Sequence, residues 1–381
     1  MWGWKEFGVA ATKQGEGRVG SVDVLKFLLA TAIVILHAGE VFGDENSLLP
    51  MGGIAVEAFF VISGCLMCAS AERDAERSEE PLGVDTARFL WRKVKAILVP
   101  YCVTVAIYLV CWLLTTGRDL LLEEGKKVLL LRLFDALPNA MLVYMAGIEQ
   151  DRILFNIVWY ISAMLIAMLV IYPLLRHFGR TYTLVIAPAS ALFLMGFMYN
   201  TAGIYKGTTN FLVFMPQGLM RAFIAINLGC VAWELSEKLK GLDLTRLSRV
   251  LLSIASVLLF LILVFVMQFG ESASCYPMTL LMPLFIGILF SRQAAGSGVF
   301  DNAVSSYLGK ASLYIYLYHV AVRRILITAE ADVTYVQAGL TMFFGAFAMF
   351  VVTDLLERLA KRIRTNSGFR ISSLFVRAQE S

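Results

Sequence analysis

A series of long apolar blocks constrains this chain more than any other feature, because each block has the length of a membrane span. A helix needs about 20 apolar residues to cross the hydrocarbon core of a bilayer. Only 16% of the 381 residues are charged, whereas about a quarter are charged in soluble domains. The blocks therefore predict an all-α, polytopic transmembrane helical bundle with about ten spans. We place the spans at residues 22–42, 52–70, 96–115, 153–175, 181–199, 218–236, 249–269, 277–291, 304–328 and 336–357.

The segments around these blocks predict the domain organisation. We expect residues 1–21 to form a cytoplasmic N-terminal segment, and the first span to be retained, because no cleavage site of a signal peptide is visible. Residues 22–357 are the expected transmembrane domain, and residues 358–381 are an expected basic cytoplasmic tail. Residues 128–147 are apolar but interrupted by charge, which is typical of an interfacial or re-entrant segment.

The distribution of lysine and arginine predicts the orientation in the membrane. Cytoplasmic loops of membrane proteins carry an excess of both residue types. Loops 43–51 and 270–276 contain neither, whereas the segments on the opposite side are rich in them. Both termini are therefore expected in the cytoplasm. Three features disagree with this assignment: loop 116–152 carries five basic residues, Lys206 would lie outside, and Arg323 and Arg324 fall at the outer end of the ninth span.

The first span carries three ionisable side chains, Asp23, Lys26 and His37. Ionisable groups inside a bilayer are candidates for function, because charge is costly to bury in hydrocarbon. Lys26 and His37 are eleven residues apart, so they share a helix face and lie roughly 16 Å apart along the axis. Asp23 lies one turn before Lys26, which predicts an ion pair. That pair is either structural or part of an anion site for a ligand entering from the cytoplasm.

Three side chains at similar predicted depth are the candidates for proton chemistry: His37, Glu57 and His319. Imidazole titrates near neutrality, so it can take a proton from an alcohol and return it to a leaving group. A carboxylate such as Glu57 would orient the imidazole and stabilise its charged form. The alternative is that each side chain is a polar group satisfied within the bundle.

Basic residues at the cytoplasmic entry of the third span are candidates for ligand binding. The spacing of Arg88, Arg92 and Lys95 places them on one helix face, on the same side of the membrane as Lys26. Such a cluster would bind the phosphates of a polyphosphate ligand. The alternative is that these residues only anchor the span at the cytoplasmic surface.

Other polar and aromatic residues in the spans have simpler explanations. Ser63 lies in a stretch of small residues, which favours close helix packing. Trp159 and Tyr160 fit an aromatic belt at the membrane surface, with stacking on a sugar as the alternative. Cys65 and Cys68 form a lone pair without the further ligands of a metal site, so no metal is expected.

Five segments, in this order along the chain, resemble motifs of the acyltransferase 3 family of bacterial integral membrane acyltransferases. They are DVLKFLLATAIVILH, VEAFFVISGCLM, FLWRKVKAILVPY, VWYISAMLI and SLYIYLYHV. The order of the motifs and the number of spans also agree, so the resemblance covers nearly the whole chain. Two positions depart from the family pattern. Lys26 replaces an arginine, which keeps the charge but loses the bidentate fork, and Glu57 stands where aspartate is commoner.

The resemblance implies transfer of an acyl group, usually acetyl from acetyl-CoA, to a hydroxyl of a cell-surface or lipid-linked carbohydrate. It implies acyl-CoA as co-substrate, no metal, and a place in the bacterial inner membrane. Some family members carry an extracellular hydrolase-like domain, whereas only a short tail follows residue 357 here. Transfer is therefore expected to be completed by this chain alone or with a separate periplasmic or extracellular partner. The net charge of +4 gives no indication of nucleic-acid binding.

The resemblance also distributes the candidate residues between two substrates. The phosphates of the donor would meet Lys26 and the 88–95 cluster, and its thioester would point towards His37 as the general base. The acceptor hydroxyl would approach Glu57, His319 and Trp159 from the outer side. The alternative is a polysaccharide or lipid-linked sugar transporter or flippase, which also uses buried charge in a helix bundle. The sequence has no visible inverted repeat that would favour it.

Overall fold

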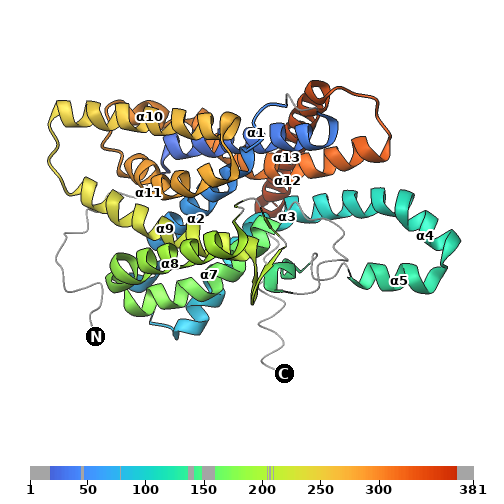
Figure 1. Cartoon of the computed structure of the whole chain (residues 1–381), viewed down its shortest axis with the longest axis horizontal. Helices are drawn as coiled ribbons and strands as arrows, with labels where there is room; N and C mark the ends of the chain where they lie inside the picture. The colour runs from blue at the N-terminus through green and yellow to red at the C-terminus, as the bar shows by residue number, and fades with distance from the viewer. Residues whose placement is uncertain are drawn as a thin grey trace.

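The computed structural model describes residues 18–43, 47–77, 79–135, 141–147, 159–203, 205, 207–208 and 210–366. Within these ranges the chain forms a bundle of α-helices (Figure 1). The described chain departs from helix and loop only at a two-stranded antiparallel ribbon of β1 (Phe211–Leu212) and β2 (Met215–Pro216). The prediction of an all-α, polytopic bundle is confirmed.

The long helices of the described chain follow the predicted order. They are α1 (Gly20–Phe42), α2 (Ala55–Arg77), α3 (Leu82–Trp112), α7 (Trp159–Phe178), α8 (Ala187–Ala202), α9 (Gln217–Lys240), α10 (Arg246–Phe269), α11 (Cys275–Ser291), α12 (Ala303–Thr328) and α13 (Tyr335–Asn366). The shorter ones are α4 (Arg118–Glu123) and α5 (Lys126–Asp135).

Nine helical segments of the described chain are long and apolar enough to cross a membrane. The ninth predicted span corresponds to α12, which is not among them, because serine, tyrosine, histidine and arginine dilute its apolar residues. The helix nevertheless packs against α1, α3 and α13. Polar side chains in a membrane segment face the interior of the bundle and not the lipid, so those of α12 are candidates for function.

The ends of several helices lie beyond the predicted spans. α2 continues to Arg77 and α3 begins at Leu82, well outside the apolar blocks at 52–70 and 96–115. The added turns are rich in charged residues that form ion pairs, so helix continues after the apolar stretch has ended. The predicted span 153–175 is described only from Trp159 onwards, where α7 begins.

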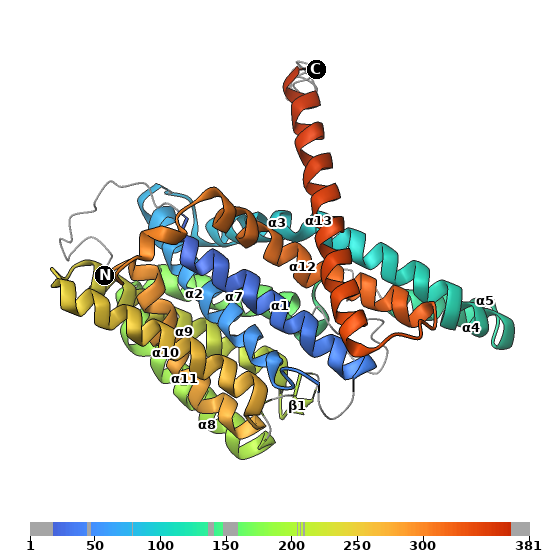
Figure 2. The ribbon, with the colours of Figure 1, turned by 90° about the horizontal axis from the view of Figure 1, so that it is seen from above.

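The predicted interfacial segment 128–147 is described in two parts. Its first part belongs to the exposed helix α5, and its second part contains a short 3₁₀ turn (Tyr144–Ala146) with two buried side chains. α3 continues through a π-helical turn (Leu113–Gly117) into α4, and α4 and α5 form an arm beside the bundle (Figure 1). Figure 2 shows that the second half of α13 also extends beyond the other helices.

Two glycines allow α2 and α9 to cross closely. A Cβ atom on Gly64 would lie 2.3 Å from the carbonyl oxygen of Ile226, and one on Gly229 would lie 2.4 Å from that of Val61. Both distances are far below van der Waals contact, so a larger residue at either position would force the helices apart. Cys65 Sγ donates to the carbonyl oxygen of Gly229 at 3.2 Å, across the same crossing. Small residues at such crossings are a common device for packing membrane helices.

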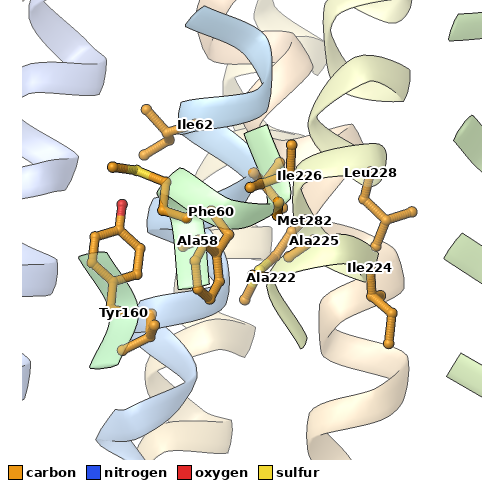
Figure 3. Close-up of a cluster of buried hydrophobic side chains, with 14 of the residues drawn as sticks. Ala58, Phe60, Ile62, Tyr160, Ala222, Ile224, Ala225, Ile226, Leu228 and Met282 are labelled. Atoms are coloured by element: carbon orange, nitrogen blue, oxygen red, sulfur yellow. The ribbon is translucent and has the colours of Figure 1, made fainter. Parts of the chain in front are cut away.

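Apolar side chains fill the space on both sides of this crossing. Figure 3 shows Phe60 of α2 between Tyr160 of α7 on one side and Ala222 of α9 on the other. Ile226 of α9 and Met282 of α11 belong to the same cluster. This main cluster also includes one face of α1, for example Leu29.

A second apolar cluster joins α1 to α12 and α13. It contains Val34 and Ala38 of α1, Tyr318 of α12 and Phe350 of α13. Because α1 contributes to both clusters, it lies between the two parts of the core. The polar residues of α1 are therefore held at the junction of the bundle.

Candidate functional site

The packing of α1 against α12 brings two of the predicted catalytic residues together. The rings of His37 and His319 are stacked, with centroids 5.4 Å apart and an interplanar angle of 11°. His319 is fully buried, whereas His37 is partly exposed. The ring of His37 is therefore the more accessible of the two.

The tautomer of His319 follows from its hydrogen bond. Its Nδ1 lies 3.0 Å from the carbonyl oxygen of Ile315. A carbonyl oxygen only accepts, so Nδ1 carries the proton in the neutral ring and Nε2 is an acceptor. Nε2 is buried and has no hydrogen-bond partner among the described residues. This atom is available to accept a hydrogen bond from a bound molecule.

Glu40 is the carboxylate that contacts His37. Nδ1 of His37 donates to Oε2 of Glu40 at 2.7 Å, one helical turn further along α1. This bond fixes the tautomer, because it places the proton on Nδ1 and leaves the lone pair on Nε2. Sequence analysis did not assign this role to Glu40. The signal was present, since residues three apart on a helix are neighbours.

Glu57 has a different partner from the one suggested by the sequence. Its Oε1 accepts a hydrogen bond from Nε of Arg221 at 2.6 Å, and both side chains are buried. The contact made by Glu57 is therefore an ion pair between α2 and α9, and not an orienting bond to His37. Its Oε2 is buried without a partner among the described residues. Arg221 was missed, although an arginine inside a predicted span is a signal of function.

A cavity of about 140 Å³ is lined by His37, Glu40 and Arg221, whereas His319 and Glu57 are not among its lining residues. Polar and aromatic side chains from α1, α7, α9, α11 and α12 line it together with the loop before β1. The guanidinium of Arg221 lies 4.8 Å from the ring centroid of Trp159 and 5.4 Å from that of Tyr205. The polar and aromatic residues of its lining include His37, Glu40, Trp159, Tyr205, Arg221 and Tyr316. The cavity thus has the imidazole–carboxylate pair on one wall and a cation between aromatic rings on another.

The two predicted aromatic residues of α7 differ in position. Trp159 lines the cavity, where a sugar ring could stack on it. Tyr160 is packed in the core, with its ring centroid 4.6 Å from that of Phe60 (Figure 3). The hydroxyls of Tyr160 and Ser63 are 3.2 Å apart and form a hydrogen bond with each other. Ser63 thus supports α7 against α2.

The predicted ion pair at the other end of α1 is present. Nζ of Lys26 lies 2.5 Å from Oδ1 of Asp23, which is buried and also pairs with Arg18. Asp23 packs against Gly309 of α12, where a Cβ atom would lie 2.2 Å from Oδ1. The ion pair of Asp23 and Lys26 therefore needs a glycine at position 309, because a larger residue there would displace the carboxylate of Asp23.

Two of the three predicted basic residues of α3 form ion pairs with aspartates. Arg92 pairs with Asp74 at 2.5 Å, and Arg88 pairs with Asp85 at 3.3 Å. Lys95 is exposed, with its Nζ 5.3 Å from the ring centroid of Trp91. The carboxylates reduce the net positive charge that Arg88 and Arg92 present to a ligand.

Lys93, like Lys95, has no acidic partner within ion-pair distance in the described part of the chain. Its charge is repelled by those of Lys26, Arg92 and Arg73, so the four cations lie near one another. Sequence analysis placed Lys93 in the basic segment but did not single it out. The structure adds it to Lys26 as a candidate for anion binding.

No group of three or more histidine, cysteine, aspartate or glutamate side chains in the described chain has the arrangement of a metal site. Cys65 and Cys68 are free thiols buried in the core.

A membrane-spanning bundle with an oriented imidazole at the wall of a cavity is suited to proton transfer. The model of the acyltransferase 3 family, described as an acyltransferase domain, matches residues 19–358. The chain therefore belongs to this family, as its five motifs predicted, and it is a multi-pass membrane acyltransferase. Searches of the curated proteins and of the solved structures found no match.

Proposed function

We propose that this protein transfers an acyl group, with acetyl as the expected one, from acyl-CoA to a hydroxyl of a cell-surface or lipid-linked carbohydrate. The observation that carries this proposal is the 2.7 Å hydrogen bond between His37 and Glu40 at the wall of the cavity. It leaves Nε2 of His37 as a base directed by a carboxylate, which is what an acyl transfer to an alcohol requires.

The proposed reaction needs one base and no covalent enzyme intermediate. Nε2 of His37 takes the proton of the acceptor hydroxyl while the oxygen attacks the thioester carbonyl. The tetrahedral intermediate then collapses, the carbon–sulfur bond breaks, and the CoA thiolate receives the proton from the imidazolium. Glu40 stabilises the imidazolium between these two transfers. The products are the carbohydrate ester and CoA.

The donor is proposed to bind at the end of α1 that carries Lys26. Lys26 and Lys93, with Arg88, Arg92 and Lys95 around them, would attract the phosphates of CoA. The helical rise puts this end roughly 16 Å from His37, and the extended arm of CoA can span such a distance. We propose that this end faces the cytoplasm of a bacterial cell, with both termini on that side of the inner membrane.

The acceptor is proposed to occupy the cavity beside His37. Trp159 and Tyr205 would stack on a sugar ring, and Arg221, held by Glu57, would bind its oxygens. The lone pair on Nε2 of His319 would accept a hydrogen bond from a second hydroxyl. A separate periplasmic or extracellular partner is needed only if the acceptor has to be delivered to this cavity.

Labelled acetyl transfer by the purified protein in lipid nanodiscs tests this function. Base catalysis contributes about 10²–10⁴-fold, so His37→Ala should lower the rate by that factor while acyl-CoA still binds. His177→Ala is the matched control, because His177 is exposed at the end of α7. Near-wild-type transfer by His37→Ala would disprove the assignment. Movement of glycan across vesicles without acylation would favour the transporter alternative.

A further inference from the structure

The last turns of α12 contain an unusual concentration of buried polar atoms without partners. Four of the seven such side-chain atoms found in the described chain belong to this stretch. They are Nε2 of His319, Nε of Arg323, Nε of Arg324 and Oγ1 of Thr328. Buried donors and acceptors in native proteins are almost always paired. A cluster of unpaired ones therefore indicates that a bound molecule completes it.

The two arginines of this cluster lie beside the catalytic pair. The charge of Arg323 acts on both Glu40 and His319, so it lies close to the base and to the stacked imidazole. Nη2 of Arg324 donates to Oγ1 of Thr115 at 3.0 Å, and its guanidinium lies 5.2 Å from the ring centroid of Tyr108. Thr115 belongs to the π-helical turn of α3, and such turns are frequent at functional sites.

Neither guanidinium has a carboxylate within ion-pair distance in the part of the chain that the structure describes. Arginine presents a planar fork of donors that matches the oxygens of a carboxylate or a phosphate. The positive-inside rule does not explain Arg323 and Arg324, because they disagree with the orientation that the other basic residues predict. Two adjacent arginines whose buried Nε atoms lack partners in the described chain thus have the chemistry of an anion site.

We propose that Arg323 and Arg324 form a subsite for an oxyanion of the acceptor, a carboxylate or a phosphate. This inference rests on the proposed function, since it specifies the acceptor of the same reaction. Arg323 is four residues beyond His319 on α12, a rise of about 6 Å. The anionic group therefore lies on the sugar that is acylated or on the next one. The preferred acceptor is an acidic carbohydrate.

Equilibrium binding without any acyl donor tests the subsite separately from catalysis. The protein is placed in phosphatidylcholine nanodiscs and titrated with three labelled trisaccharides, which end in glucuronate, glucose 6-phosphate or glucose. The wild type should bind at least one acidic probe about 10- to 100-fold more tightly than the neutral probe, as expected for charge-assisted hydrogen bonds. Arg323→Gln and Arg324→Gln should remove this preference, and Arg323→Lys should retain part of it.

The matched control is Arg118→Gln, because Arg118 is an exposed arginine that pairs with its neighbour Asp119. This variant should keep the preference, and thermal unfolding should show that all variants are folded. Equal binding of the three probes, no binding of the acidic probes, or a preference that survives both glutamine substitutions would overturn the proposal.

A repeat in nanodiscs with phosphatidylglycerol separates the acceptor from a lipid headgroup as the source of the anion. Binding of the acidic probe should persist there, and its loss by competition would assign the arginines to the bilayer instead. If the wild type shows the preference but transfers no acyl group, the proposed function fails and the subsite stands. If it transfers acyl groups equally to acidic and neutral probes, the subsite fails and the function stands.

Discussion

The role of Glu40 can be tested by removing its charge and keeping its shape. Glu40→Gln retains a group that can accept a hydrogen bond from Nδ1 of His37, which now lies 2.7 Å from a carboxylate oxygen. A hydrogen bond to a charged group contributes about 1.5–3 kcal/mol, which corresponds to about 10- to 150-fold in rate. The side chain of Glu40 is 49% exposed, so solvent screening favours the lower end of this range. We expect kcat to fall about tenfold.

The assay is acetyl transfer at saturating concentrations of both substrates, with KM measured for each. Glu40 acts on the base and not on the ground-state complex, so kcat should fall while both KM values stay unchanged. Glu237→Gln is the matched control, because Glu237 also pairs with a residue three positions away, Lys240, but on an exposed surface. A kcat within twofold of the wild type, or a loss expressed only in KM, would refute the orienting role.

Three further substitutions test the packing and the donor site. Gly229→Ala should lower the stability by about 1–3 kcal/mol, seen as a lower Tm, because its Cβ atom would meet the carbonyl oxygen of Val61 at 2.4 Å. Arg221→Leu should destabilise by about 3–5 kcal/mol, since it leaves the buried carboxylate of Glu57 without a counter-ion. Lys26→Ala should weaken acyl-CoA binding and reduce its dependence on salt, measured by titration at several ionic strengths.

Each of these three substitutions has a matched control variant. Gly196→Ala should leave Tm nearly unchanged, because a Cβ atom at this helical glycine meets nothing within 4 Å. Glu57→Gln combined with Arg221→Leu should cost less than Arg221→Leu alone, and an equal cost would mean that the pair is not coupled. Lys240→Ala should not change acyl-CoA binding, and equal losses for Lys240 and Lys26 would return Lys26 to a purely structural role.

Sequence reasoning succeeded where the signal is local. The spans follow from runs of apolar residues, and the pair of Asp23 and Lys26 follows from their separation by three positions on a helix. The same local rule applies to His37 and Glu40, but Glu57 was the favoured carboxylate because it was predicted at the same depth.

The tertiary contacts of the site could not be predicted from local sequence patterns. Glu57 and Arg221 are 164 positions apart, and Arg324 and Thr115 are 209 apart. The first contact exists because small residues let α2 and α9 approach closely, and the second because α3 passes α12 at a π-helical turn. Hydrophobic periodicity identifies which face of a helix is buried, but it does not identify the helix that covers that face.

The position of α1 between the two apolar clusters bears on how the substrates meet. A transporter that works by rocking needs two rigid bodies that can separate around a central site. Here the same helix is embedded in both parts of the core, through Leu29 on one side and Val34 on the other. A hinge motion between these two parts would break the packing of α1 against one of them. If the donor and the acceptor bind as proposed, the two ends of α1 would give them a common rigid support, and the length of the substrates would bring the reacting atoms together.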